Sequence, residues 1–137
     1  MEAILPPVPG SLAEARRMVN DLPNAPRDVV ENAKLVLNEL LANEIKHGRY
    51  GPGDPLVCRV EREPGAVRIE VRHSGPTFDM PAAPAPRVLE LRETGWGLAL
   101  ITRIADRWGV TDREGARRVW AEIDLPRPGD RHLASLR

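Results

Sequence analysis

The clearest pattern in the chain is a repeat of apolar residues between positions 27 and 47. Apolar side chains recur there every three or four residues, which predicts a helix with one buried face. They are Val29, Val30, Ala33, Val36, Leu37, Leu40 and Leu41. The helix is expected to begin near Pro26 or Arg27 and to end at His47, because Gly48 follows and glycine commonly stops a helix.

Two further helices are predicted from shorter signals. Ser11 and Glu14 have the spacing of a capping box, so a helix should begin at Ser11 and continue to about Asn20. The third helix is expected to start near Gly97 and to run through LALITRIADR, which ends at Arg107.

Strict alternation of apolar and polar residues predicts two antiparallel hairpins. The first joins residues 56–61 to 67–72 through a turn at Glu63-Pro64-Gly65. The second joins residues 108–111 to 117–125 through a turn at Glu114-Gly115. Each strand has one polar face, so the sheet should be covered on a single side.

The order of these elements predicts the fold class. Helices and antiparallel hairpins that follow one another in this way indicate an α+β two-layer sandwich, with the helices on one face of the sheet. We expect one domain over residues 1–126 and a flexible tail over 127–137. Residues 76–94 contain four prolines and are expected to form a long loop, with a short helix near 88–91.

Composition narrows the class of protein. The chain has 137 residues, 42% hydrophobic and 29% charged, with 20 basic and 20 acidic side chains. A net charge of zero argues against direct nucleic-acid binding. One cysteine excludes an internal disulfide, and no apolar run approaches the ~20 residues of a membrane span. The expected location is the cytoplasm.

A stripe of hydrogen-bonding side chains runs along the long helix. Residues four apart differ by only about 40° around a helix, so Glu39, Asn43 and His47 are expected to share one stripe at the edge of the apolar face. Solvated helices place such groups opposite the apolar face. This stripe therefore indicates a site where a ligand is held against the helix. For His47 the alternative is a favourable interaction with the helix dipole.

Three stretches together resemble a known family. They are ELLANEIKHG at 39–48, VRIEVRHSGPTFD at 67–79 and TGWGLALI at 94–101. In this order they resemble the GHKL (Bergerat) ATPase fold, and most of all the small bacterial anti-sigma-factor serine kinases of the HATPase type. The resemblance covers roughly residues 10–125.

The resemblance implies a Mg-ATP site and assigns its residues. Glu39 is the implied general base, and Asn43 is the implied ligand of Mg²⁺. The residues implied to contact the nucleotide are Asn43, His47, His73, Gly75, Gly95, Trp96, Gly97 and Leu98. Glycines before a helix let its N–H groups approach phosphate oxygens, and the 76–94 loop is the implied lid.

Four positions depart from the pattern of the family. His73 stands where relatives have an Asp that accepts a hydrogen bond from the adenine amine, and Thr77 replaces a glycine. Arg118 is aligned with a Thr that relatives place near the adenine. Glu44 replaces a small residue inside the apolar arc, where it must pair with a basic side chain or face a partner. The alternative for His73 is a strand end that faces solvent.

The resemblance implies a regulatory protein kinase. Such a protein binds Mg-ATP, phosphorylates a serine of an anti-anti-sigma (STAS) partner, binds a sigma factor and forms a homodimer. The alternative is a non-catalytic protein-binding module with a degenerate ATP pocket. The catalytic domain of a two-component histidine kinase and a zinc site are weaker alternatives, because a phosphoacceptor helix and His or Cys ligands at metal spacing are missing.

Overall fold

The structure is a computed structural model that describes residues 1–47, 53–73, 96–113 and 116–127. The elements along the chain are β1 (Glu2–Leu5), α1 (Ser11–Asn20), α2 (Arg27–His47), β2 (Leu56–Glu63), β3 (Ala66–His73), α4 (Trp96–Ile104), β4 (Arg107–Arg113) and β5 (Ala116–Asp124). The expected 76–94 loop, the Glu114-Gly115 turn and most of the expected tail lie outside the described residues.

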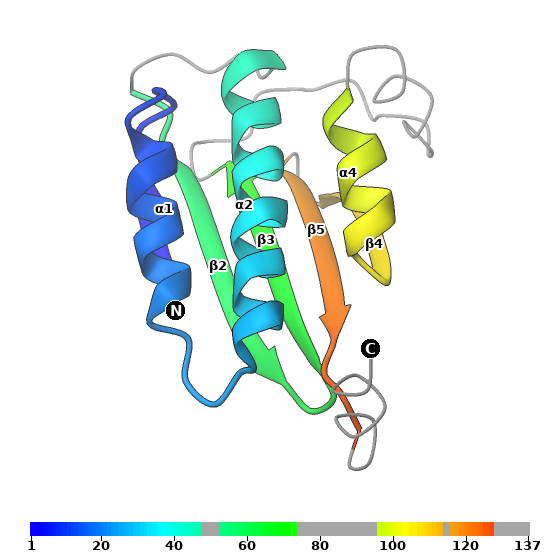
Figure 1. Ribbon diagram of the computed structural model, residues 1–137. Coiled ribbons are helices and arrows are strands. Elements are labelled where there is room, and N and C mark those ends of the chain that lie inside the picture. The colour runs from blue at the N-terminus through cyan, green and yellow to red at the C-terminus, as the bar shows by residue number, and fades with distance from the viewer. Residues whose placement is uncertain (48–52, 74–95, 114–115, 128–137) are drawn as a thin grey trace.

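The five strands form one antiparallel sheet in the order β1-β2-β3-β5-β4. Figure 1 shows α1, α2 and α4 on one face of this sheet, with α2 between the other two helices. The expected α+β two-layer sandwich is therefore confirmed. The β2–β3 hairpin turns at Gly65, whose φ of 84° is a conformation that glycine adopts without the steric cost of a side chain.

The core lies between α2 and the sheet. The apolar arc of α2 packs on the helix-facing side chains of the central strands, and Val36, Leu37 and Leu41 are fully buried. On the sheet, residues two apart share a face, so the odd-numbered positions of β3 and β5 point toward the helices. Val71 of β3 and Val119 of β5 illustrate this orientation: they are register partners, and both side chains are buried on the helix side. The predicted amphipathic pattern of the long helix is thus confirmed.

Two features at the N-terminus differ from expectation. The sequence analysis did not predict β1, a strand of four residues that pairs with the edge of β2 from Glu2↔Arg59 to Leu5↔Leu56. The capping box is wrong: α1 does begin at Ser11, but its N-cap is Gly10 and no side-chain cap bond forms. The buried Ser11 hydroxyl instead donates to the Pro6 carbonyl at 2.7 Å, because the chain from β1 turns back over the start of α1.

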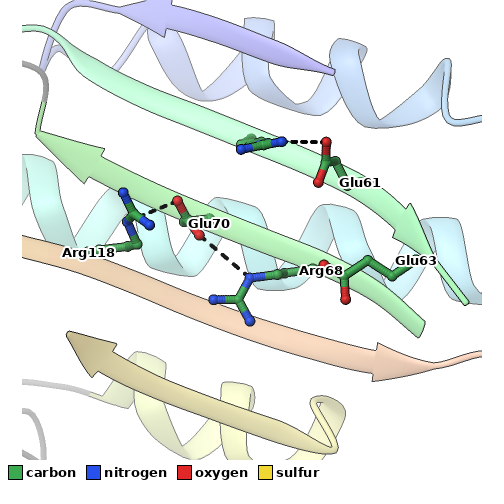
Figure 2. A pocket seen from close by; sticks show the side chains of 6 residues that line it. Glu61, Glu63, Arg68, Glu70 and Arg118 are labelled. Atoms are coloured by element: carbon green, nitrogen blue, oxygen red, sulfur yellow. Dashed lines mark hydrogen bonds and ion pairs between the residues drawn. The ribbon is translucent and has the colours of Figure 1, made fainter. Parts of the chain in front are cut away.

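The face of the sheet opposite the helices is covered by charged side chains. A shallow hollow of about 230 Å³ is lined there by Arg59, Glu61, Glu63, Arg68, Glu70 and Arg118. Figure 2 shows the labelled members of this set on neighbouring strands, with the helices behind the sheet. We call this surface the open face. None of the described helices is long and apolar enough to cross a membrane.

Candidate functional site

The three sequence stretches meet at one edge of the molecule. Figure 1 shows the last turns of α2 beside the first turn of α4, above the ends of the central strands. The strand β3 ends at this edge with His73, and β5 begins there with Ala116. Residues that lie far apart in the sequence are therefore brought together on the helix-facing side of the sheet.

The position of α1 shows which flank of α2 carries Glu39 and Asn43. Arg16 of α1 donates a hydrogen bond of 2.8 Å to the Asn38 side chain, so Asn38 lies on the flank that faces α1. By helical angle, Asn43 lies about 140° from Asn38, on the opposite side of the buried arc. That opposite flank faces α4. Glu39 and Asn43 are both partly exposed.

The start of α4 supplies backbone donors to the same region. The helix begins at Trp96, so Trp96, Gly97 and Leu98 form its first turn. The first N–H groups of a helix have no partner within the helix and carry partial positive charge, which suits them to phosphate oxygens. Gly75 and Gly95 lie outside the described residues, as do the side chains of His47, Trp96 and Leu98.

His73 is buried, so the alternative of a solvent-facing strand end is wrong. It is the last residue of β3, and its register partner on β2 is Leu56. Its side chain is only 8% exposed and points to the helix side of the sheet, in phase with Val71. The Asp54 carboxylate lies nearby, with Oδ1 3.8 Å from Nε2 of the imidazole. The position where the resemblance implies a carboxylate thus holds an imidazole beside a carboxylate.

Glu44 forms an ion pair with Arg117 beneath α2. The carboxylate is 7% exposed and the guanidinium side chain 18%, and the Glu44 Oε1 to Arg117 Nε distance is 3.5 Å. This pair connects the residue after Asn43 to the beginning of β5. Of the two explanations that the sequence left open for Glu44, the structure supports pairing with a basic side chain.

Arg118 does not lie on the site side of the sheet. Its guanidinium forms an ion pair with Glu70 on the open face, with 3.1 Å between Nε and Oε1. The neighbouring Arg117 occupies the helix side. The sequence did contain the signal for this assignment, because Arg117 alternates in phase with the apolar residues Val119 and Ala121.

The charged side chains on the open face pair with one another. Glu61 accepts a hydrogen bond from Arg59 at 2.6 Å, and this bond lowers the pKa of the Glu61 carboxyl. Hydrogen bonds from Arg107 and Arg68 lower the pKa of Glu122 in the same way. The charges of these pairs therefore neutralise one another within the face. Among the described residues no group of His, Cys, Asp and Glu has the arrangement of a metal site.

The fold is an α+β two-layer sandwich in which the end of α2, the start of α4 and the ends of β3 and β5 meet at one edge. The match to a family model makes the class specific. Residues 5–123 match the family described as the histidine kinase-like ATPase domain, which is most of the chain. The chain belongs to this family, and the expected GHKL fold is confirmed. An ATPase domain of this kind implies the use of ATP.

A search of the curated proteins found no match. Among solved structures, the chain is similar to the RsbU and RsbW domains of Rv1364c from Mycobacterium tuberculosis, with a TM-score of 0.63 and 16% sequence identity. The similarity covers 93% of this chain but only 33% of that one, so the present chain corresponds to about a third of the larger protein. At this identity the comparison supports the fold alone.

Proposed function

We propose that the chain is an ATP-binding regulatory protein of the anti-sigma-factor kinase type, which phosphorylates a serine of a STAS partner. The observation that carries the proposal is the placement of Glu39 and Asn43 on the flank of α2 that faces α4. Support also comes from the family, from the motif resemblance and from a fold shared with the RsbU and RsbW domains of Rv1364c.

The residues of the site fit Mg-ATP. Asn43 would hold Mg²⁺ through its amide oxygen, which is a ligand type that Mg²⁺ accepts. The N–H groups of the first turn of α4 would hold phosphate oxygens. When bound, Mg-ATP supplies the phosphoryl group and a cation that neutralises its charge. Binding and positioning are the tasks of these residues.

Glu39 is proposed as the general base. It lies one helical turn before Asn43, so its carboxylate is near the place where the phosphates would end. There it would orient the serine hydroxyl of the partner and accept its proton as the serine oxygen bonds to the γ-phosphorus of ATP, while the bond from that phosphorus to the bridging oxygen breaks and ADP leaves. Its partial exposure leaves room for that hydroxyl to approach.

The proposed partners are a sigma factor and a STAS protein, and the proposed assembly is a homodimer in the cytoplasm. Each is carried over from the proteins that the motifs resemble. Light scattering of the purified chain gives its oligomeric state directly, and a monomeric mass at micromolar concentration would remove the dimer from the proposal.

Calorimetric titration with ATP and ADP, with and without Mg²⁺, tests nucleotide binding. We expect binding that Mg²⁺ strengthens. No binding up to millimolar nucleotide would overturn the proposal and favour the alternative, a protein-binding module whose pocket is degenerate.

A phosphotransfer assay with radiolabelled ATP and the STAS proteins of the same organism tests the role of Glu39. The Glu39→Ala variant should lose at least about a hundredfold in transfer rate, because general-base catalysis typically contributes that much, while it retains ATP binding. Glu31→Ala is the matched control, because Glu31 lies on the same helix and its side chain is 54% exposed. Equal transfer by the two variants would remove Glu39 from the mechanism.

A further inference from the structure

One end of the open face is a row of residues that contains cations but no carboxylate. Cross-strand partners share a face of the sheet, so the register of the four strand pairs places one residue from each strand in this row. The row lies two positions along the strands from Arg59 and Glu70, which line the hollow, and is therefore on the same face. We call it the end row, and its members are Ile4, Val57, Arg72, Arg118 and Thr111.

Farther along the open face, opposite charges alternate. Two rows away from the end row, acidic and basic residues occupy successive strands, and each of them takes part in an ion pair. These residues are Glu61, Arg68, Glu122 and Arg107. The end row instead has arginines on two neighbouring strands. Its positive charge is produced by the register of the strands, because the chain as a whole has 20 basic and 20 acidic residues.

The two arginines of the end row are poorly compensated. Arg72 and Arg118 lie directly opposite each other on β3 and β5, where like charges destabilise a sheet. Figure 2 shows Arg118 paired with Glu70, but that carboxylate also pairs with Arg68, at 3.5 Å, so one anion serves two cations. Arg72 is half-buried and forms no ion pair within the described part of the chain. A ligand that brings an anion here would remove a repulsion that the free protein carries.

The rest of the end row indicates what kind of ligand brings the anion. Ile4, at the β1 end, is 66% exposed, so an apolar side chain is open to a partner beside the two cations. Because strands lie about 4.8 Å apart, Ile4 is about 10 Å from Arg72 and about 14 Å from Arg118 along the row. An extended peptide places the side chains of one face about 7 Å apart. An apolar residue followed by acidic residues two and four positions later therefore matches the row.

A nucleic-acid backbone matches this face less well. Its phosphates repeat negative charge over a long stretch, whereas the binding surface for it must be positive over a comparable length. Beyond the end row, the open face carries the acidic residues Glu2, Glu61 and Glu63, which would repel further phosphates. A short acidic segment of a protein needs only the two arginines.

We propose that the end row is a docking surface for an acidic segment of a partner protein, which lies across the strands in an extended conformation. Its carboxylates would form charge-assisted hydrogen bonds with Arg72 and Arg118, and its apolar residue would cover Ile4. The surface is on the opposite side of the sheet from the region between α2 and α4. The inference therefore goes beyond the proposed function and requires no nucleotide.

The first test is an NMR titration with the peptide acetyl-Leu-Ser-Glu-Ser-Glu-amide. We expect a dissociation constant of about 1 mM or tighter, with chemical-shift changes centred on the end row. Arg72→Met and Arg118→Met should each weaken binding about five- to tenfold, because methionine keeps an apolar stem and removes the charge. Arg107→Met is the matched control and should leave binding unchanged, because Arg107 lies on the same face and is already paired with Glu122. The peptide with Gln in place of both Glu residues should bind at least about fivefold more weakly.

Several results would overturn the inference. They are no shift changes at 10 mM peptide, equal binding of the Glu and Gln peptides, and an effect of Arg107→Met as large as that of Arg72→Met. A second copy of the chain is the other possible occupant, and sedimentation tests it. If the wild-type chain is a dimer that Arg72→Glu dissociates, the end row is buried between copies and the proposed docking is wrong. Failure of the wild-type chain to bind ATP would overturn the proposed function alone.

A second measurement needs no ligand. Removal of the repulsion by Arg72→Met should raise the Tm by about 1–4 °C at low ionic strength. This gain should shrink in 1 M NaCl, where the Debye length is about 3 Å. Arg107→Met, which removes a compensated charge, should not raise the Tm. A Tm of Arg72→Met below that of the wild type would show that the Arg72 charge stabilises the fold, and would overturn the inference.

Discussion

The buried pair of Glu44 and Arg117 allows a quantitative test of how α2 is held to the sheet. We consider Glu44→Leu, Arg117→Leu and the double replacement. Removal of one partner from a buried ion pair costs roughly 3–5 kcal/mol, because the other charge remains desolvated. The partner that remains, Arg117 at 18% exposure or Glu44 at 7%, can recover part of its hydration, so we expect each single replacement to cost about 2–3 kcal/mol, with Arg117→Leu the more costly of the two.

The double replacement should behave differently. Two leucines leave neither charge of the pair uncompensated and place apolar surface between α2 and β5. The free energy of unfolding of the double variant should therefore lie within about 1 kcal/mol of that of the wild type. The two single effects then add to far more than the double effect. The difference is the coupling energy of the pair, about 3–7 kcal/mol on these numbers.

Urea denaturation measures these differences. At the m-values usual for small domains, a cost of about 2–3 kcal/mol lowers the urea midpoint by about 1–2 M. The control is the pair Lys34–Glu31 on the outer surface of the same helix, at 3.2 Å but with side-chain exposures of 21% and 54%. Although its ion pair is shorter, we expect a coupling below about 0.5 kcal/mol, because exposed pairs are solvated in both states.

A double variant of Glu44 and Arg117 that loses as much stability as the two single variants combined would refute this reasoning. So would a coupling no larger than that of the Lys34–Glu31 control. Either result would mean that the two side chains are hydrated individually, and that the pair does not hold α2 to β5.

Two further predictions concern the sheet. Gly109→Ala should lower the free energy of unfolding by about 1–3 kcal/mol, measured by urea denaturation, because the new Cβ would lie 2.9 Å from the Trp120 ring. That ring is itself held, since the Arg68 guanidinium lies 4.5 Å from its centroid. Gly10→Ala is the control, because a Cβ at Gly10 would have no atom within 4 Å, and an equal cost for both variants would contradict this account. Burial raises the pKa of the Cys58 thiol from 9.0 to about 12, so between these pH values the unfolded chain loses a proton that the folded chain keeps. The stability should therefore fall with rising pH over this window, by up to about 1.4 kcal/mol per pH unit, and this contribution should be missing from the pH profile of Cys58→Ala.

The helices and most strand positions could be predicted from local patterns. The long helix was placed correctly from Arg27 to His47, since its apolar repeat is sustained and bounded by Pro26 and Gly48. The hairpins were predicted from alternation, although β4 begins at Arg107 and α4 ends at Ile104, earlier than expected. Helix ends depend on where the next element must start, so local signals define them poorly.

The partners of the polar side chains could not be predicted in the same way. Ser11 had the spacing of a capping box, yet its hydroxyl donates to Pro6, because the turn from β1 brings that carbonyl close. Nothing near Asp54 in the sequence indicates that it lies beside His73. That proximity follows from the pairing of β2 with β3.

By itself the sequence determined which residues form helices and strands and which face of each is apolar, because periodicity is a property of neighbouring residues. It also placed Glu39 and Asn43 on one stripe of α2. Only the tertiary structure decided that β1 completes the sheet, that Glu44 meets Arg117, and that Asp54 meets His73. Each of these contacts joins residues far apart in the chain, and their approach depends on strand order, register and helix packing, which local patterns do not encode.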